Sequence, residues 1–272
     1  MSRFLSLAEA VESTLRDGDT VAMEGFTHLI PFAAGHEVIR QRRRHLTLIR
    51  MTPDIIYDQL IGMGCADRLI FSWVGNPGVG SLHRFRDAYE KGWPAPITIE
   101  EHSHAAMANA YAAGASGLPF AVFRGYLGVD LPKVNPNIKR IVCPFTGEEL
   151  AAVPAIRPDV AVIHALRADR AGNVLIEGIV GVQKEIVDDF GARSANAVIL
   201  PSWTVGAIAC VPGGAHPSYA HGYYKRDNAY YKAWDAVSRD RDGFLAWMKQ
   251  NVLDLGPEAF AAHAAHPRAA AE

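Results

Sequence analysis

Cysteine is scarce in this sequence. The 272 residues contain only Cys65, Cys143 and Cys210, which lie far apart and form no Cys-x-x-Cys pair. An odd number of widely spaced cysteines is typical neither of a disulfide framework nor of a structural zinc site. The sequence therefore favours a reducing compartment, and we expect a cytoplasmic protein without a metal centre.

Long apolar stretches are also missing. No segment approaches the roughly 18 consecutive apolar residues of a membrane-spanning helix. Residues 1–20 contain Asp and Glu and no apolar run of signal-peptide length. Neither sign of charge dominates, because 27 Lys and Arg residues oppose 29 Asp and Glu residues, for a net charge of −2. We therefore expect neither a membrane nor a nucleic acid as a main partner.

Short apolar strands and amphipathic helices alternate along most of the chain. Hydrophobic residues make up 49% of it, enough for one large core. The alternation predicts an α/β fold with an open, mainly parallel sheet and helices on both faces. We expect a single domain over residues 1–260 and a frayed, Ala-rich tail over 261–272. The predicted strands are 20–23, 46–51, 68–74, 97–99 and 120–123, and the predicted helices are 32–42, 54–63, 82–91 and 103–113.

Regular patterns also occur at both ends of the chain, with an irregular segment between them. A capping box formed by Ser6 and Glu9 begins a helix before the first of these strands. From Arg124 to Glu149 the chain is rich in Pro, Gly and Asn, which is more typical of a binding or partner-contacting loop than of a linker. Further strands are predicted at 160–164, 174–176, 197–200 and 204–210, and further helices at 228–237 and 243–252.

A binding corner is predicted within Asp17 to Pro31, DGDTVAMEGFTHLIP. A glycine at the carboxyl end of an inner strand lets backbone amides approach an anionic or acyl ligand closely. Gly25, Phe26, Thr27 and His28 are expected to offer amides and a hydroxyl to an acyl oxygen or a carboxylate of such a ligand. The alternative is an ordinary connecting turn between a strand and a helix, without a role in binding.

A glycine-rich loop, GNPGVGS, runs from Gly75 to Ser81 between a predicted strand and a predicted helix. Its amides can hold a carboxylate or a phosphate, with Gly78, Gly80 and Ser81 as contacts, Asn76 as the specific donor and Ser81 as the helix N-cap. It is neither a Walker loop nor a G-x-G-x-x-G motif, so a nucleotide is disfavoured. A tight turn that binds nothing is the alternative.

Acids and imidazoles gather in Glu100-Glu101-His102-Ser103-His104, at a junction between a strand and a helix. We expect Glu101 and His104 to orient a water or a substrate carboxyl group. The alternative is that the two acids only favour a helix N-terminus. Two histidines without a third ligand nearby do not indicate a metal site.

The segment from Val211 to Tyr224 is rich in Gly, His and Tyr. It is expected to line a channel for an acyl ligand, with His216 and Ser218 as polar contacts and tyrosines as walls. Alternatively it is an interface between protein chains, where aromatic residues are favoured.

The stretch DGDTVAMEGF resembles the N-terminal signature of family I coenzyme A transferases. The similarity continues in the same order along most of the chain and is greatest to the A subunits of enzymes that act on 3-oxoadipate or glutaconate. Matching segments include RMTPDIIYDQLIG, GNPGVGSLHRFRDA, EEHSHA, DLPKVNPNIK, CPFTGEELAAVP, GVQKE and VPGGAHPSYAHGYYKRDN.

The resemblance implies that CoA passes between carboxylic acids by a ping-pong route, from succinyl-CoA to 3-oxoadipate. It implies no permanently bound cofactor, because the coenzyme A thioester is itself a substrate. The nucleophile would be a glutamate in a Glu-Asn-Gly motif of a partner chain, the B subunit. In this chain Glu177-Gly178 and Glu148-Glu149 lack the context of that motif, so we expect the nucleophile on the partner.

Some positions depart from the family pattern. Glu24 stands where a first glycine is usual, and Leu29-Ile30-Pro31 lacks the glycine expected before the proline. After Glu185 about fifteen residues of the family pattern are missing, roughly a crossover and a short strand. The alternatives are therefore a glutaconate-type transferase, an acyl-CoA hydrolase in which Glu101 admits water to the intermediate, and a non-catalytic binding or scaffold subunit.

Overall fold

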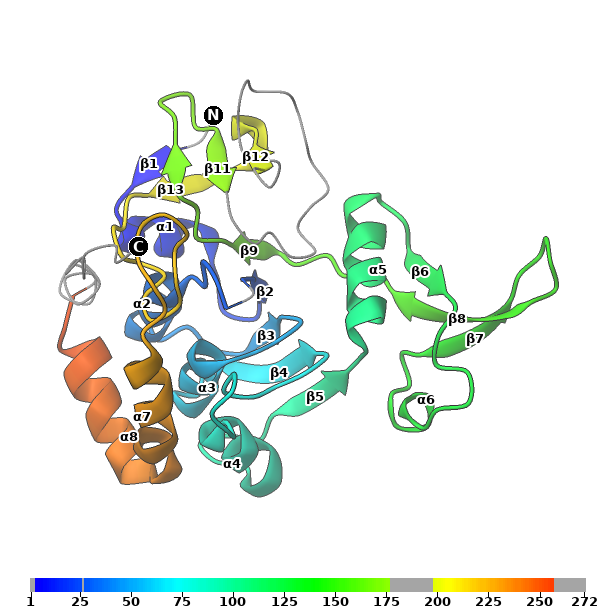
Figure 1. Ribbon diagram of the computed structural model, residues 1–272, viewed down its shortest axis with the longest axis horizontal. Coiled ribbons are helices and arrows are strands. Elements are labelled where there is room, and N and C mark those ends of the chain that lie inside the picture. Colours follow the sequence, from blue (N-terminus) through cyan, green and yellow to red (C-terminus); the bar gives the residue numbers. More distant parts are fainter. Residues whose placement is uncertain (1–2, 26, 177–197, 257–272) are drawn as a thin grey trace.

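A five-stranded parallel sheet forms the centre of the molecule (Figure 1). The computed structural model describes residues 3–25, 27–176 and 198–256. The strand order is β5-β4-β3-β2-β9, and each neighbouring pair is parallel. The strands are β2 (Thr20–Met23), β3 (Leu46–Ile49), β4 (Ala66–Phe71), β5 (Thr98–Glu101) and β9 (Val160–Val162). The predicted mainly parallel sheet is confirmed.

Helices pack against both faces of this sheet. The main core lies between one face and α2 (Phe32–Arg40), α3 (Ile55–Gly62), α4 (His83–Lys91), α7 (Asn228–Arg239) and α8 (Arg241–Met248). A π-helical turn, Lys249–Leu253, continues α8. On the other face, Met107 of α5 (His104–Ala115) packs against Ala22 and Ile49. The sheet and the helices of the main core are called the body below.

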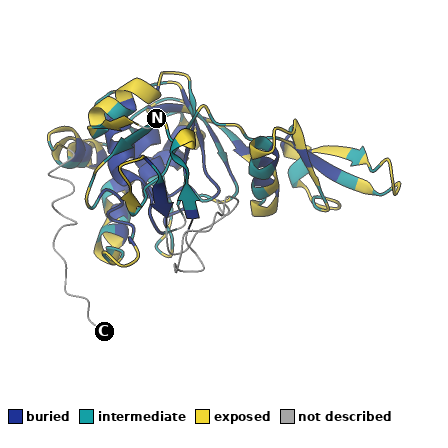
Figure 2. Cartoon of the chain, turned by 90° about the horizontal axis from the view of Figure 1, so that it is seen from above, coloured by how far each residue is buried: buried dark blue, intermediate teal, exposed yellow. Residues whose placement is uncertain are grey.

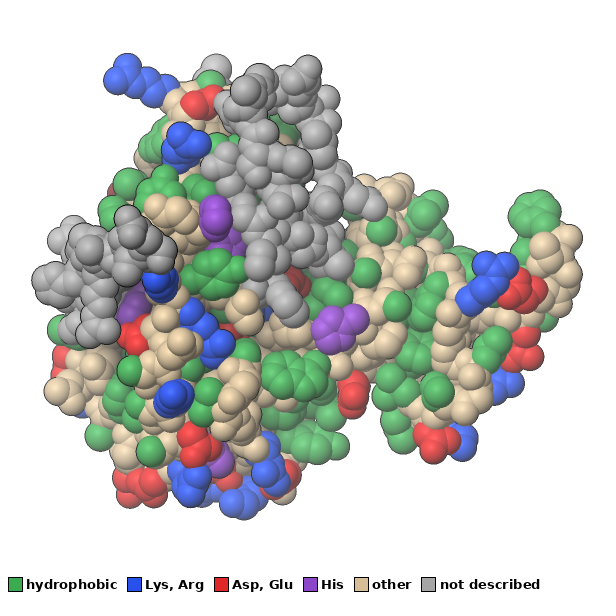
Figure 3. All heavy atoms as spheres, in the orientation of Figure 1, with side chains coloured by type: hydrophobic (Ala, Val, Ile, Leu, Met, Phe, Trp, Pro, Cys, Tyr) green, Lys and Arg blue, Asp and Glu red, His purple; other side chains and the backbone are tan. Residues whose placement is uncertain are grey.

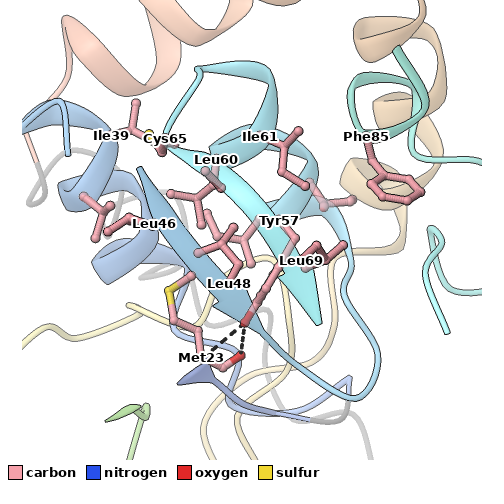
Figure 4. Packing of buried hydrophobic residues seen from close by; sticks show 14 of the residues in the cluster. Met23, Ile39, Leu46, Leu48, Tyr57, Leu60, Ile61, Cys65, Leu69 and Phe85 are labelled. Carbon is pink, nitrogen blue, oxygen red and sulfur yellow. Dashed lines mark hydrogen bonds between the residues drawn. The ribbon is translucent and has the colours of Figure 1, made fainter. Parts of the chain in front are cut away.

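The side chain of Tyr57 joins the ends of β2 and β3 through the core (Figure 4). Its hydroxyl donates to the carbonyl of Ile49 at 2.7 Å and to that of Met23 at 3.2 Å, and it accepts from the Met23 N–H. Tyr57 is fully buried. These bonds satisfy backbone groups that the strands leave unpaired where they separate.

The N-terminal helix begins as predicted. In α1 (Leu7–Thr14) the hydroxyl of Ser6 accepts from the Glu9 N–H, and the Glu9 carboxylate accepts from the Ser6 N–H. The sequence analysis missed a short strand before it, β1 (Arg3–Leu5), which pairs in parallel with β13 (Ala207–Ala209). Three residues are too few for a visible alternation of polar and apolar side chains.

The expected irregular loop between residues 124 and 149 is partly wrong. This stretch contains α6 (Leu131–Val134) and β7 (Lys139–Val142) and leads into β8 (Glu149–Pro154). With β6 (Phe120–Phe123) these strands form an antiparallel sheet in the order β6-β8-β7. Residues 118–154, called the lobe below, project from the body beyond α5 (Figures 1 and 2).

A third small sheet joins β10 (Arg167–Ala168), β11 (Val174–Ile176) and β12 (Val198–Leu200), and a short 3-10 helix, Ser202–Thr204, follows it. The shortened region after Glu185, the Glu177-Gly178 pair and the tail from residue 261 lie outside the described residues. Within the described part of the chain, no helix is both long and apolar enough to cross a membrane.

Candidate active site

The predicted binding corner lies where β2 ends, next to the carboxyl end of β3. We call residues 24–31 the β2 corner; of these, Phe26 lies outside the described residues. The backbone has positive φ at Gly25 (150°), Thr27 (55°) and Leu29 (52°). Such angles are uncommon for residues with a side chain and persist only where neighbouring contacts impose them.

Gly25 is required by the corner itself. A Cβ atom added to it would lie 2.7 Å from the carbonyl oxygen of His28 and 3.1 Å from the Cα of Ile30. A side chain at this position would therefore clash with the corner's own backbone. A Gly25 substitution tests the folding of the corner as much as any contact with an acyl group.

Arg50, directly after β3, holds the corner by a hydrogen bond to its backbone. Its side chain is 1% exposed. Nη2 donates to the carbonyl of Gly25 at 2.6 Å, and Nη1 donates to Oδ1 of Asp54 at 2.9 Å. Such charge-assisted bonds hold a backbone group more firmly than neutral ones do. The sequence analysis missed Arg50, although a charged residue at the end of an apolar strand was a signal for it.

Glu24 contributes a half-buried carboxyl group to the corner. Its Oε1 accepts from the hydroxyl of Tyr111 at 2.7 Å and from the N–H of Met51 at 3.3 Å. Burial raises the pKa of Glu24, an effect opposed by the charge of Arg50 and by these hydrogen bonds. Because Tyr111 belongs to α5, this pair joins the corner to the helix beside the lobe.

His28 is buried and attaches the corner to the segment from Val211 to Tyr224. Its Nε2 accepts from the N–H of His221 at 3.0 Å, and its ring centroid lies 4.5 Å from that of Tyr219. The N–H of Leu29 donates to the carbonyl of Tyr219 at 3.0 Å. The imidazole of His28 thus supports the corner, whereas its predicted ligand contact stays a prediction.

The hydroxyl of Ser218, a predicted substrate contact, is bonded within the protein. It is fully buried, donates to the carbonyl of Ala215 at 2.6 Å and accepts from the N–H of Ile30 at 3.0 Å. His216 is also buried, with Nε2 3.8 Å from a carboxylate oxygen of Asp227. The bond from the Ile30 N–H attaches Ser218 to the β2 corner, and the predicted ligand contacts of His216 and Ser218 stay predictions.

The Gly75–Ser81 loop is a tight turn around a buried Asn76. The Asn76 side chain donates to the carbonyl of Tyr231 at 2.7 Å, and its N–H donates to the carbonyl of Gly80 at 2.9 Å. The side-chain amide of Asn76 is thus bonded within the protein, and its role as a ligand donor stays a prediction. Ser81 is not the helix cap, because α4 begins at His83 with Leu82 as its N-cap.

Gly78 and Gly80 in this loop have φ of 77° and 146°, which explains why glycine occupies these positions. A Cβ atom on Gly78 would meet no atom within 4 Å. The outer side of the turn is therefore open, and the predicted contacts of Gly78, Gly80 and Ser81 with a ligand remain predictions.

At the end of β5 the acid–imidazole pair differs from the predicted one. Glu101 and His104 are both exposed, and no hydrogen bond or ion pair joins these two described residues. Instead, Oε1 of Glu100 lies 2.8 Å from Nε2 of His102, and Arg68 contacts the other oxygen of Glu100. Burial opposes ionisation of Glu100, but bonds from His102 and Asn137 and the charge of Arg68 outweigh it and lower its pKa to about 2.

The difference has a simple geometric cause. Residues two apart in a strand share one face, whereas residues three apart do so only in a helix. β5 extends to Glu101 and α5 begins at His104, so Glu100 and His102 lie on one side and Glu101 faces the other. Within the described residues, no three His, Cys, Asp or Glu side chains are grouped to hold a metal ion.

Comparisons with known proteins agree with this architecture. Residues 4–209 match the family model described as Coenzyme A transferase. The chain is 63% identical over 266 residues to the A subunit of 3-oxoadipate CoA-transferase from Pseudomonas knackmussii, covering 93% of this chain and 94% of that one. It is 33% identical over 288 residues to the A subunit of glutaconate CoA-transferase from Acidaminococcus fermentans, covering 94% of this chain and 89% of that one. The crystal structure of glutaconate coenzyme A-transferase from that organism superposes with a TM-score of 0.85 at 30% identity, over 98% of this chain and 93% of that one.

Proposed function

This chain belongs to the coenzyme A transferase family, and we propose that it is the A subunit of a two-chain enzyme that moves CoA from succinyl-CoA to 3-oxoadipate. The observation that carries the proposal is the 63% identity, over 93% of the chain, to a protein named for that acceptor. We further propose that the chain works in the cytoplasm as one domain over residues 1–260, with a B subunit for its partner.

The proposed chemistry is a covalent relay that keeps the thioester energy from water. The carboxylate of a glutamate in the partner chain attacks the carbonyl carbon of succinyl-CoA, the C–S bond breaks, and CoA thiolate leaves as a mixed anhydride forms. The thiolate then attacks the glutamyl carbon, which releases succinate and leaves an enzyme–CoA thioester. The carboxylate of 3-oxoadipate repeats these steps in reverse order, releasing 3-oxoadipyl-CoA and restoring the glutamate.

In this scheme the described chain supplies the binding half of the site. The β2 corner would offer backbone amides to the oxyanion that forms when the thioester carbonyl is attacked. Arg50 contributes by holding the carbonyl of Gly25, which fixes the neighbouring peptide groups. Preorganised donors of this kind are effective because they need no rearrangement as charge develops.

The exposed pair of Glu101 and His104 has a different proposed use. Both lie at the carboxyl end of β5, the same edge of the sheet as the corner, where ligands of parallel sheets bind. If water reached the acyl intermediate, Glu101 is the residue that would direct it. Hydrolysis instead of transfer is therefore an outcome to be measured in the assay of the reconstituted enzyme.

The test compares three preparations: this chain by itself, the B subunit by itself, and both chains co-expressed and purified as a complex. Each is assayed for CoA transfer from succinyl-CoA to 3-oxoadipate and for release of free CoA. We expect transfer only in the complex. Release of free CoA without transfer would replace the proposal by hydrolysis, and failure of the two chains to associate would favour a non-catalytic role.

A further inference from the structure

The lobe exposes several large apolar side chains on one short segment. We call residues 126–135, which include α6, the α6 loop. In this loop Leu127 is 46% exposed, Val129 is 51% exposed and Val134 is 78% exposed. Apolar residues exposed singly are common on protein surfaces, whereas several on one segment are typical of a site of interaction. The α6 loop is therefore a candidate contact surface.

Two hydrogen bonds attach the α6 loop to the carboxyl end of β5. The hydroxyl of Tyr126 accepts from the N–H of Ser103 at 2.6 Å. The side-chain amide of Asn135, which is buried, donates to the carbonyl of Glu101 at 2.7 Å. Both ends of the loop are thus fixed, so its exposed side chains are presented in a defined arrangement. A preorganised surface of this kind loses little conformational entropy when it binds a partner.

The charges of the α6 loop neutralise each other. Asp130 and Lys133 are its charged residues, and the ammonium group of Lys133 donates to a carboxylate oxygen of Asp130. The loop therefore offers an apolar surface without net charge, as is typical of the centre of a protein–protein interface. Because its one cation is already paired, it is poorly suited to an anionic ligand such as coenzyme A, which favours free cationic donors.

The α6 loop borders the edge of the sheet at which the candidate site lies. β2 and β5 belong to one parallel sheet, so the β2 corner and the carboxyl end of β5 share an edge. Figure 3 shows a notch between the body and the lobe, in the region where Figure 1 places α6 opposite the end of β5. A protein that covers this edge therefore meets the α6 loop as well.

The inference rests on the function proposed above, in which the nucleophilic glutamate belongs to the partner chain. We propose that the α6 loop is a docking surface for an apolar patch of that partner, the B subunit. Its glutamate can reach the β2 corner only if the B subunit lies over the carboxyl edge of the sheet, to which the loop is bonded. A second copy of this chain on the loop would obstruct that approach.

The experiment measures the dissociation constant of the purified complex of both chains, by dilution and analytical ultracentrifugation. Val134→Lys places a charge in the proposed contact, whereas Val142→Lys places the same charge on β7, outside the loop. Both valines are largely exposed, so neither change should disturb the fold. We expect Val134→Lys to raise the dissociation constant at least tenfold, because it forces an unpaired charge into an apolar contact, and Val142→Lys to leave it unchanged.

Transfer activity separates docking from substrate binding. With the B subunit in excess, Val134→Lys should recover the kcat and the KM for succinyl-CoA of the unmodified complex, because the loop contributes to association and not to the chemistry. A raised KM with unchanged association would overturn the proposal and make the loop part of the substrate site. Equal weakening by Val142→Lys would overturn it too, as would self-association of this chain that Val134→Lys abolishes.

Amide hydrogen exchange tests the same surface without any substitution. The amides of the α6 loop should exchange at least tenfold more slowly in the complex than in this chain alone. Unchanged exchange in a complex that transfers CoA would overturn the docking surface and leave the proposed function standing. If the two unmodified chains did not associate, the proposed function and the docking surface would both be overturned, which is a distinguishable result.

Discussion

The body and the lobe have cores of different composition. Large side chains such as Phe32, Leu48 and Trp234 fill the core of the body, whereas the lobe and α5 meet mainly through alanines. The lobe also exposes large apolar side chains: Val134 is 78% exposed and Phe145 is 94% exposed. Figure 3 shows apolar side chains spread over the surface of the lobe. Since stabilisation grows with the apolar area buried, the large core residues of the body contribute more than the alanines between the lobe and α5.

The body holds the segment in which residues with positive φ lie closest together. The β2 corner, with three positive φ values, is attached to the well-packed body through Arg50 and His28. Within the described residues the lobe has one non-glycine residue with positive φ, Tyr126 at 63°. The β2 corner belongs to the body, and the bond from Tyr111 to Glu24 joins it to α5, the helix beside the lobe.

Among the substitutions in the body, Arg50→Met is expected to cause the largest loss in the free energy of unfolding. This change leaves the buried carboxylate of Asp54 without its cation and the Gly25 carbonyl without its donor. The loss of half of a buried pair costs about 3 to 5 kcal/mol. Chemical denaturation of the isolated chain measures the free energy of unfolding, and the assay of the complex should show that transfer activity falls with it.

The double variant Arg50→Met, Asp54→Leu separates the ion pair from the corner. Removing both charges relieves the unpaired carboxylate, so this variant should be more stable than Arg50→Met alone. Its transfer activity should stay low because the Gly25 carbonyl still lacks a donor. If the double variant recovered full activity, Arg50 would have no role in fixing the corner.

A matched pair of truncations measures the contrast between the two cores directly. Leu48→Ala removes a fully buried side chain from the body and should cost about 3 kcal/mol. Val153→Ala removes a smaller side chain from the alanine-rich core of the lobe, where it is 1% exposed, and should cost about 1 kcal/mol. Equal losses, measured by denaturation, would mean that the lobe is as tightly integrated as the body.

The body was more predictable from the sequence than the lobe for the same physical reason. Buried strands such as Thr20–Met23 and helices such as Asn228–Arg239 carry clear apolar patterns or caps. β7 has the sequence KRIV between turns and is largely exposed, so neither alternation nor hydrophobicity marks it as a strand. Its pairing with β8 becomes visible only in three dimensions.

Within the candidate site, the sequence indicated the position of the corner but not its contacts. The glycine at the end of β2 was recognisable, whereas Arg50 and Ser218 reach the corner from positions 25 and 188 residues away. Such long-range contacts leave no local pattern. The pairing of Glu100 with His102 was not visible in the sequence, because it depends on the boundary between β5 and α5, which decides which residues share a face.

Acid titration should reveal a smaller contribution to stability, made by Glu100 at the junction of body and lobe. Because the pKa of Glu100 is lowered from 4.5 to about 2, its contribution to stability is complete above pH 4.5 and is lost as the pH falls towards 2. Its partner Arg68 is 43% exposed, and solvent screening limits the contribution to about 1 kcal/mol. Unfolding free energies of the unmodified chain and Glu100→Gln, measured from about pH 6 to pH 3, should converge at low pH. A constant difference over this range would contradict this assignment.

The smallest effect on stability is expected at the tip of the lobe. Phe145 is 94% exposed, so Phe145→Ser removes almost no buried area and should change the free energy of unfolding by less than about 0.5 kcal/mol. Phe123→Ser, at a partly buried position that packs against the lobe core, should cost more, since it removes contacts with that core. Denaturation of the isolated chain compares the two variants. A large loss in Phe145→Ser would show that the tip is covered in solution, and the lobe would then be more like the body than its exposed side chains indicate.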